Sequence, residues 1–221
     1  MEYYQITQNE KEFHIEGFPN ATKLIKIGGQ KAKRLADLSL HKSDLDFAAE
    51  CLEAINRVAD EPNIIRQVLW HSAVVHFFKC FGDSSARFQL NARDNIYRGD
   101  MQGQEIFKYF KSLRNKFLIH DENSYAQCIP GAVLNKRDHP YKIEKIVCFS
   151  ALADTLNQPN YSNLKLLIQK AKSWVVSEFD TLCGILTKEL EAESYDDLLS
   201  REGITYRAPT ANEIHENKNV P

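Results

Sequence analysis

The stretch RNKFLIH, residues 114–120, places an arginine and a histidine six positions apart. The guanidinium of Arg114 stays charged in proteins and can hydrogen-bond two oxygens of one phosphate group. The imidazole of His120 belongs to the side-chain type that exchanges protons near neutral pH. These residue types, at this spacing, indicate a candidate site for proton transfer beside an anion.

A helix is expected to carry this stretch, because the apolar residues of MQGQEIFKYFKSLRNKFLIHDENS recur every three to four positions. Its apolar stripe consists of Ile106, Phe110, Leu113 and Phe117, and the next position in the series is His120. An imidazole facing a core costs desolvation unless its nitrogens find partners, so a core histidine bonded to a carbonyl or carboxylate is the alternative. Arg114 lies about 120° around and about 9 Å along such a helix from His120. The two side chains therefore cannot simply stack, but they can border one cleft, and a kink at the helix end or a second copy of the helix across a two-fold axis would bring them closer.

The N-terminal half shows further helix signals. Gly28-Gly29 predicts a turn before a helix, and a strong amphipathic helix is expected from Ser43, as N-cap with Asp46 at N3, to a stop at Pro62. Residues 63–81 are apolar on most sides and predict the most buried helix of a bundle. A short polar helix or loop is expected over 83–100.

The C-terminal half adds a hairpin and a last long helix. Two strand-like runs surround the turn sequence KRDHP within 126–153, and helical spacing resumes near residue 163. We therefore expect a mainly α protein, a bundle of four to six helices with a small β-hairpin insertion and an N-terminal extended arm. The expected divisions are an arm over 1–28, a helical domain over 29–199 and an acidic tail over 200–221.

Composition narrows the class of protein. The chain is 43% apolar and 26% charged, which is typical of a folded protein, and it has neither a leader-like start nor an apolar run of about 18 residues. We expect a cytoplasmic protein with no membrane partner. The net charge of −2 argues against general nucleic-acid coating, although 85–120 holds seven Lys/Arg against three Asp/Glu. Five cysteines without a CxxC pair predict reduced, mostly buried thiols, and no metal or organic cofactor is expected.

The motif resembles that of the HEPN domain (higher eukaryotes and prokaryotes nucleotide-binding). In that family an arginine is followed after four to six residues by a histidine, on a late helix of an all-helical bundle. Arg114 and His120 match the two fixed positions, Asn115 matches the polar position after the arginine, and the continuation HDENSY is also similar. The resemblance covers roughly residues 43–190 in architecture and 114–125 in motif.

The resemblance implies a homodimer whose two motifs face each other, and in many members a metal-independent endoribonuclease. RNA is cleaved when its 2′-hydroxyl attacks the adjacent phosphate, which requires proton transfer and a cation for the developing charge. Three residues are therefore candidate catalytic residues: His120 for the proton, Arg114 for the phosphate and Asn115 for orientation. The candidate substrate-binding residues are Lys108, Lys111, Lys116, Asp121 and Asn123.

Several alternatives stay open at this point. The same chain holds a second Arg and His pair, Arg66 and His71, early in its helix, which we rank second. His71 and His76 are otherwise expected to be buried structural histidines. The function is expected to be RNA cleavage by a toxin or defence protein, with an antitoxin or regulatory protein as a further expected partner. A non-catalytic dimer that binds a nucleotide or a protein partner is the first alternative, and an accidental motif is the second.

Overall fold

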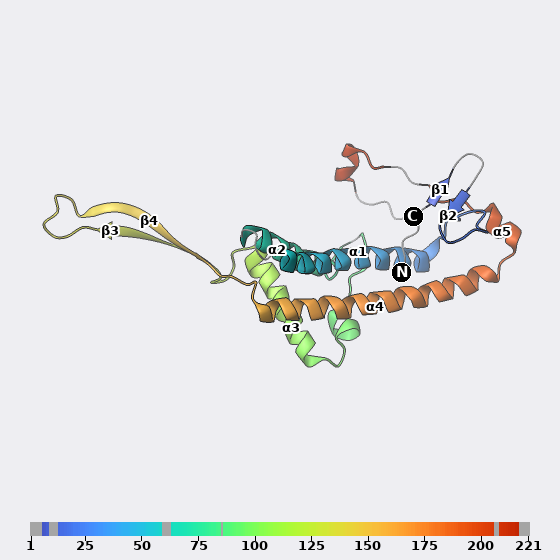
Figure 1. Cartoon of the computed structure of the whole chain (residues 1–221), viewed down its shortest axis with the longest axis horizontal. Helices are drawn as coiled ribbons and strands as arrows, with labels where there is room; N and C mark the ends of the chain where they lie inside the picture. The colour runs from blue at the N-terminus through green and yellow to red at the C-terminus, as the bar shows by residue number, and fades with distance from the viewer. Residues whose placement is uncertain (1–5, 9–12, 59–62, 85, 206–207, 217–221) are drawn as a thin grey trace. The chain divides into compact units, whose positions relative to one another are not determined.

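A computed structural model of the chain describes residues 6–8, 13–58, 63–84, 86–205 and 208–216. It is mainly helical with two antiparallel hairpins, which confirms the coarse prediction of a helical fold carrying a β-hairpin (Figure 1). The order is β1 (Ile6–Gln8), β2 (Phe13–Ile15), α1 (Gly29–Arg57), α2 (Asn63–Lys79), η1 (Ala92–Ile96), α3 (Met101–Leu113), η2 (Arg114–Ile119), β3 (Ala126–Leu134), β4 (Ile143–Leu152), α4 (Gln158–Glu191), α5 (Tyr195–Ser200) and η3 (Ala211–His215).

Helix α1 begins fourteen residues before the predicted N-cap at Ser43, so that prediction is wrong. The predicted turn is confirmed, since Gly29 has a φ of +88° where the helix starts. Ser43 lies inside the helix, and its hydroxyl donates to the carbonyl oxygen of Ser39 at 3.2 Å. The physical reason is a continuous buried seam that alternates steps of three and four residues, formed by Leu38, His41, Leu45, Ala48, Leu52 and Ile55.

The chain divides into two compact units, and the candidate motif lies in the second. This unit comprises residues 44–81 and 90–171. Its core consists of side chains from α1, α2, α3 and α4 that are almost completely buried: Leu45, Leu52, Ile55, Trp70, Val74, Phe77, Phe110, Leu164, Leu167 and Ile168. Two buried hydrogen bonds link elements of this unit: Tyr161 of α4 donates to the Leu52 carbonyl oxygen of α1 at 3.1 Å, and Tyr97, at the end of η1, donates to the Leu167 carbonyl oxygen of α4 at 3.0 Å.

Helix α2 is buried along one face and exposed along the other. Trp70, Ala73 and Phe77 are fully buried, and the Trp70 indole donates to the hydroxyl of Thr155 at 3.0 Å. The prediction of the most buried helix does not hold for its first turns, where Ile64 is 67% exposed, and the prediction that His71 is a buried histidine is wrong, because His71 is exposed. The apolar residues of α2 therefore cover more of its surface than the helices packed against one of its faces can bury.

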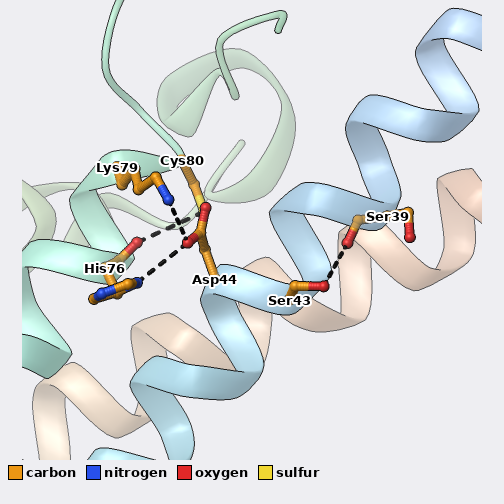
Figure 2. A network of polar contacts seen from close by, with 6 residues as sticks. All are labelled: Ser39, Ser43, Asp44, His76, Lys79 and Cys80. Carbon is orange, nitrogen blue, oxygen red and sulfur yellow. Dashed lines mark hydrogen bonds and ion pairs between the residues drawn. The ribbon is translucent and has the colours of Figure 1, made fainter. Parts of the chain in front are cut away.

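Asp44 fastens α1 to α2 within this unit (Figure 2). Its Oδ1 accepts from His76 Nδ1 at 3.1 Å and from Lys79 Nζ at 3.0 Å. Cys80 is fully buried, and its thiol lies 3.8 Å from the backbone carbonyl oxygen of His76. These contacts hold two helices together, and a buried thiol that faces a carbonyl is not arranged as a nucleophile.

The other unit comprises residues 1–43, 82–89 and 172–221. The buried His41 donates from Nε2 to the carbonyl oxygen of Phe88 at 2.8 Å, and Asp37 accepts from the Phe88 amide at 3.2 Å. Arg34 lies 4.4 Å from the centre of the Phe88 ring, which adds a cation–π contact. Residues 86–89 are thus attached to the first turns of α1.

The C-terminal residues of this unit pair with the arm that precedes α1. Ile25 forms an antiparallel bridge with Gly203, and Lys23 donates to the carbonyl oxygens of Leu199 and Arg201.

Helix α4 starts at Gln158, five residues before the predicted position, because the Asn157 side chain caps it by accepting from the Asn160 amide at 2.9 Å. No helix among the described residues is long and apolar enough to cross a membrane.

The predicted hairpin is present as β3 and β4, which pair antiparallel along nine registered positions (Figure 1). Every residue of β4 is exposed, and so is every residue of β3 except its first. Cys128 and Cys148 lie in these strands and are exposed, so the prediction of mostly buried thiols is wrong for them. A two-stranded sheet has no second layer of its own with which to cover either face.

Candidate functional site

Helix α3, which leads to the motif, has a defined start. The Asp100 side chain caps it by accepting from the amide of Gly103 at 2.8 Å, and the same carboxylate pairs with Lys170. The hydrogen bond from Lys170 and the Gly103 amide lower the pKa of Asp100, so this carboxylate stays ionised at neutral pH. Phe110 and Leu113 then bury the last turn of α3 against the core.

The helix changes type at Arg114. Residues Arg114–Ile119 form a π-helical turn, in which each hydrogen-bonded turn takes one residue more than in an α-helix. The turn ends at His120, whose backbone is extended, with φ −134° and ψ 143°. Single π-helical turns are rare in proteins, and those that occur are often found at functional sites. Here the turn covers the interval between the two fixed residues of the motif.

The predicted seam position of His120 is wrong. Because the π-helical turn adds a residue to the helix and the helix ends at Ile119, the α-helical projection fails beyond Leu113, and His120 is exposed. No hydrogen bond or ion pair of its side chain occurs among the described residues. A core histidine is therefore not the correct interpretation, and the imidazole is accessible to a ligand from solvent.

Arg114 is half-buried and only partly satisfied. Its Nη1 donates to Oδ1 of Asn115 at 2.8 Å, whereas its buried Nε–H has no partner among the described residues. A guanidinium carries five N–H donors, so this one keeps donors available for an anion. Asn115, the polar position of the motif, thus holds the arginine directly.

The residues after His120 fold back onto the π-helical turn. The amide of Glu122 donates to the carbonyl oxygen of Lys116 at 2.9 Å, and the rings of Phe117 and Tyr125 meet edge to face at 5.5 Å. Asn123 accepts from the Tyr125 amide at 3.0 Å, which uses its oxygen in a turn. Asp121 is exposed. The fold therefore places Asn123 as a local support of the turn and leaves Asp121 accessible.

The three predicted substrate-binding lysines are exposed. Lys108 pairs with Glu105 at 2.6 Å on the surface of α3, which offsets part of its charge. Lys111 and Lys116 carry no such pair among the described residues. The positive charge beside the motif thus comes chiefly from Lys111, Arg114 and Lys116.

The second Arg and His pair lies on a neighbouring element, since α2 contacts the π-helical turn. Arg66 shares an unusual feature with Arg114: its Nε–H is buried and has no partner within the described ranges. Burial of part of the ring lowers the pKa of His71, which favours its neutral form. The two Arg and His pairs are alternatives in the sequence. Periodicity describes each helix separately, so it cannot predict that the two elements that carry these pairs are in contact.

Among the residues that the structure describes, no three His, Cys, Asp or Glu side chains lie together as a metal ion would require. No family model, curated protein or solved structure matches the chain. The HEPN resemblance accordingly stays a prediction that rests on the motif and on the mainly helical architecture.

Proposed function

We propose that the protein is a metal-independent endoribonuclease of the HEPN type, with Arg114 and His120 in its active site. One observation supports this assignment above the others. A π-helical turn spans the interval between the two residues, exposes the imidazole and leaves a buried Nε–H of the arginine without a protein partner. A buried donor without a partner is costly. We propose that the remaining Nη donors of this half-buried guanidinium contact the anion, and that a shift of the side chain on binding gives the Nε–H a partner as well.

The proposed reaction is internal transesterification. The 2′-oxygen of a ribose loses its proton and forms a bond to the adjacent phosphorus, the bond from phosphorus to the 5′-oxygen breaks, and the leaving oxygen gains a proton. The products are a 2′,3′-cyclic phosphate and a 5′-hydroxyl end. His120 transfers one of these protons, while Arg114 contacts the phosphate oxygens as negative charge develops on them.

A homodimer belongs to this proposal for a chemical reason. The reaction needs a proton acceptor and a proton donor, and the motif supplies one histidine per chain. Two motifs that face each other, as the resemblance implies, would supply both. We extend the proposal to an antitoxin or regulatory protein that silences this activity.

Lys111 and Lys116 are proposed to guide the RNA backbone. They are exposed beside the motif, where cations raise the local concentration of a polyanion. Cleavage at low substrate concentration should then weaken steeply as salt is added, and a rate that is insensitive to salt would remove the lysines from the proposal.

A second candidate function is a non-catalytic dimer that binds a nucleotide or a protein. The observation that favours it is the lack of any orienting hydrogen bond on His120 among the described residues, since catalytic histidines are ordinarily held by a second group. This alternative predicts binding of a nucleotide or RNA without turnover.

The deciding experiment incubates the full chain with mixed single-stranded RNAs in excess chelator. Arg114→Ala and His120→Ala serve as site variants, and Lys145→Ala, an exposed charge on β4, serves as the matched surface control. Cleavage by the parent and the control that leaves cyclic-phosphate ends, and is lost in both site variants, would support the ribonuclease. Folded variants that retain full cleavage, or a folded parent that binds RNA without cleaving it, would contradict it.

A further inference from the structure

The hairpin exposes apolar side chains on both faces. In its register Ile129 lies opposite Phe149 and Gly131 opposite Val147, on one face, while Ala132 lies opposite Ile146 on the other. Phe149 is 68% exposed and Ile146 is 67% exposed. The run IVCFSAL, residues 146–152, has no charge, proline or glycine. Such a nearly continuous apolar run, interrupted only by Ser150, is typical of a strand whose two faces are both covered, whereas every residue of β4 is exposed and β4 has one neighbour in its sheet.

The backbone groups at the two outer edges follow from the register. The amide of Ala153 donates to the carbonyl oxygen of Tyr125 at 2.8 Å, so these two residues form a hydrogen-bonded pair. Hydrogen-bonded and non-hydrogen-bonded pairs alternate along an antiparallel ladder. Pro130 and Cys148, five positions further along, therefore form a non-hydrogen-bonded pair whose backbone groups point outward.

The two edges consequently differ. Proline has no N–H group, so the outer edge of β3 lacks a donor at Pro130, and proline on an edge strand prevents further pairing. The outer edge of β4 presents the N–H and C=O groups of Ile146, Cys148 and Ser150 without interruption. One edge of the hairpin is blocked and the other is open.

We propose that the open edge of β4 pairs with β4 of a second copy of this chain, antiparallel and centred on Cys148, to form a four-stranded sheet. In this register Val147 lies opposite Phe149 of the second copy, a β-branched residue against an aromatic one, and Ile146 lies opposite Ser150. Glu144 and Lys145 face Leu152 and Ala151 of the second copy, so no like charges meet. A two-fold axis makes every contact occur twice, which makes the strand its own complement.

This pairing is separate from the proposed active site. Residue 152 at the base of one hairpin and its counterpart in the second copy are eight residues apart along the sheet, or about 26 Å at about 3.3 Å per residue. The two motifs, each just before its hairpin, would then lie at different ends of the sheet. The cleft of the proposed ribonuclease requires a different contact, so an effect of Cys148→Pro on assembly with RNA cleavage unchanged tests the β4 pairing alone.

The test compares two proline variants of the full chain, Cys148→Pro and Cys128→Pro. Both remove an outward-pointing N–H and leave the bonds between β3 and β4 in place, but only the first blocks the open edge. Light scattering on a sizing column should show the mass of the parent halved by Cys148→Pro and kept by Cys128→Pro. A parent that stays monomeric across the concentration range, or an assembly that survives Cys148→Pro, would overturn the proposal.

A second measurement does not depend on a proline being tolerated. Mild oxidation of the parent should join two chains through Cys148, because opposite residues in a hydrogen-bonded pair have Cα atoms about 5.5 Å apart, within reach of a disulfide. Cys148→Ser should abolish the cross-linked dimer and Cys128→Ser should retain it. A cross-link that needs Cys128 instead would overturn this register. RNA cleavage, measured beside it, is expected to be the same in all four variants.

Discussion

Arg114 donates a hydrogen bond from Nη1 to Oδ1 of its neighbour Asn115, at 2.8 Å, inside the π-helical turn. Adjacent side chains on an α-helix diverge by about 100°. Here the amide holds the guanidinium at one end while its Nε–H stays without a protein partner in the described part of the chain. The hydrogen bond to Asn115 therefore fixes the orientation of the Arg114 guanidinium.

Asn115→Ala should lower the rate of RNA cleavage about ten- to a hundredfold, because the hydrogen bond to a charged group, worth roughly 1.5–3 kcal/mol, no longer orients Arg114. The urea midpoint of unfolding should change little, since Asn115 is only half-buried. Cleavage by the folded variant at the parental rate would show that Asn115 does not position the arginine. Asn115→Asp is the informative companion, because it keeps an acceptor but pairs the cation with a charge.

Trp70→Phe should destabilise the protein by about 1–3 kcal/mol, since it leaves the buried hydroxyl of Thr155 without its donor and removes buried ring atoms. Urea unfolding followed by circular dichroism measures the change. Thr155→Val tests the same bond from the other side. If the bond is the cause, the double variant should lose less stability than the two single variants added together.

Ser43→Ala should leave stability unchanged or raise it by about 0.5 kcal/mol, because alanine has the better helix propensity and Ser43 is inside α1. Ser194→Ala is the matched comparison, since the Ser194 hydroxyl accepts from the Asp197 amide at 3.1 Å and caps α5. Its loss should cost about 1 kcal/mol locally, seen as faster amide exchange in α5. A marked loss of stability in Ser43→Ala would instead support Ser43 as the N-cap of the helix, as predicted from the sequence.

Asp100→Asn should remove a pH-dependent contribution to stability. The lowered pKa of Asp100 in the folded state means that its ionised form stabilises the fold above the ordinary carboxyl pKa, and that this contribution is lost as the pH falls through the folded-state pKa. The difference in urea midpoint between parent and variant should be constant above about pH 5 and shrink below about pH 4. A difference that does not change between pH 7 and pH 3 would contradict this role of the carboxylate.

Local patterns in the sequence predicted several elements correctly. The apolar runs around KRDHP predicted β3 and β4, because turn residues between two strand-like runs act through short-range geometry. Local patterns also predicted α2, which begins at Asn63 directly after Pro62. Pro62 itself lies outside the described residues. The predicted start of α1 at Ser43 was wrong, because the buried face of the helix extends to both sides of Ser43. The burial of that face favours a continuous helix over a start capped by the Ser43 side chain.

The candidate site shows where the sequence stops being sufficient. By itself the sequence determined the residue types of the motif, Arg114, Asn115 and His120, and the helix that carries them. Only the tertiary structure decided that the last turn is π-helical, that His120 leaves the seam, and that α2 contacts the turn. A helical projection assumes one constant rotation per residue. The choice between α and π turns depends instead on contacts with residues distant in sequence, which no local pattern records.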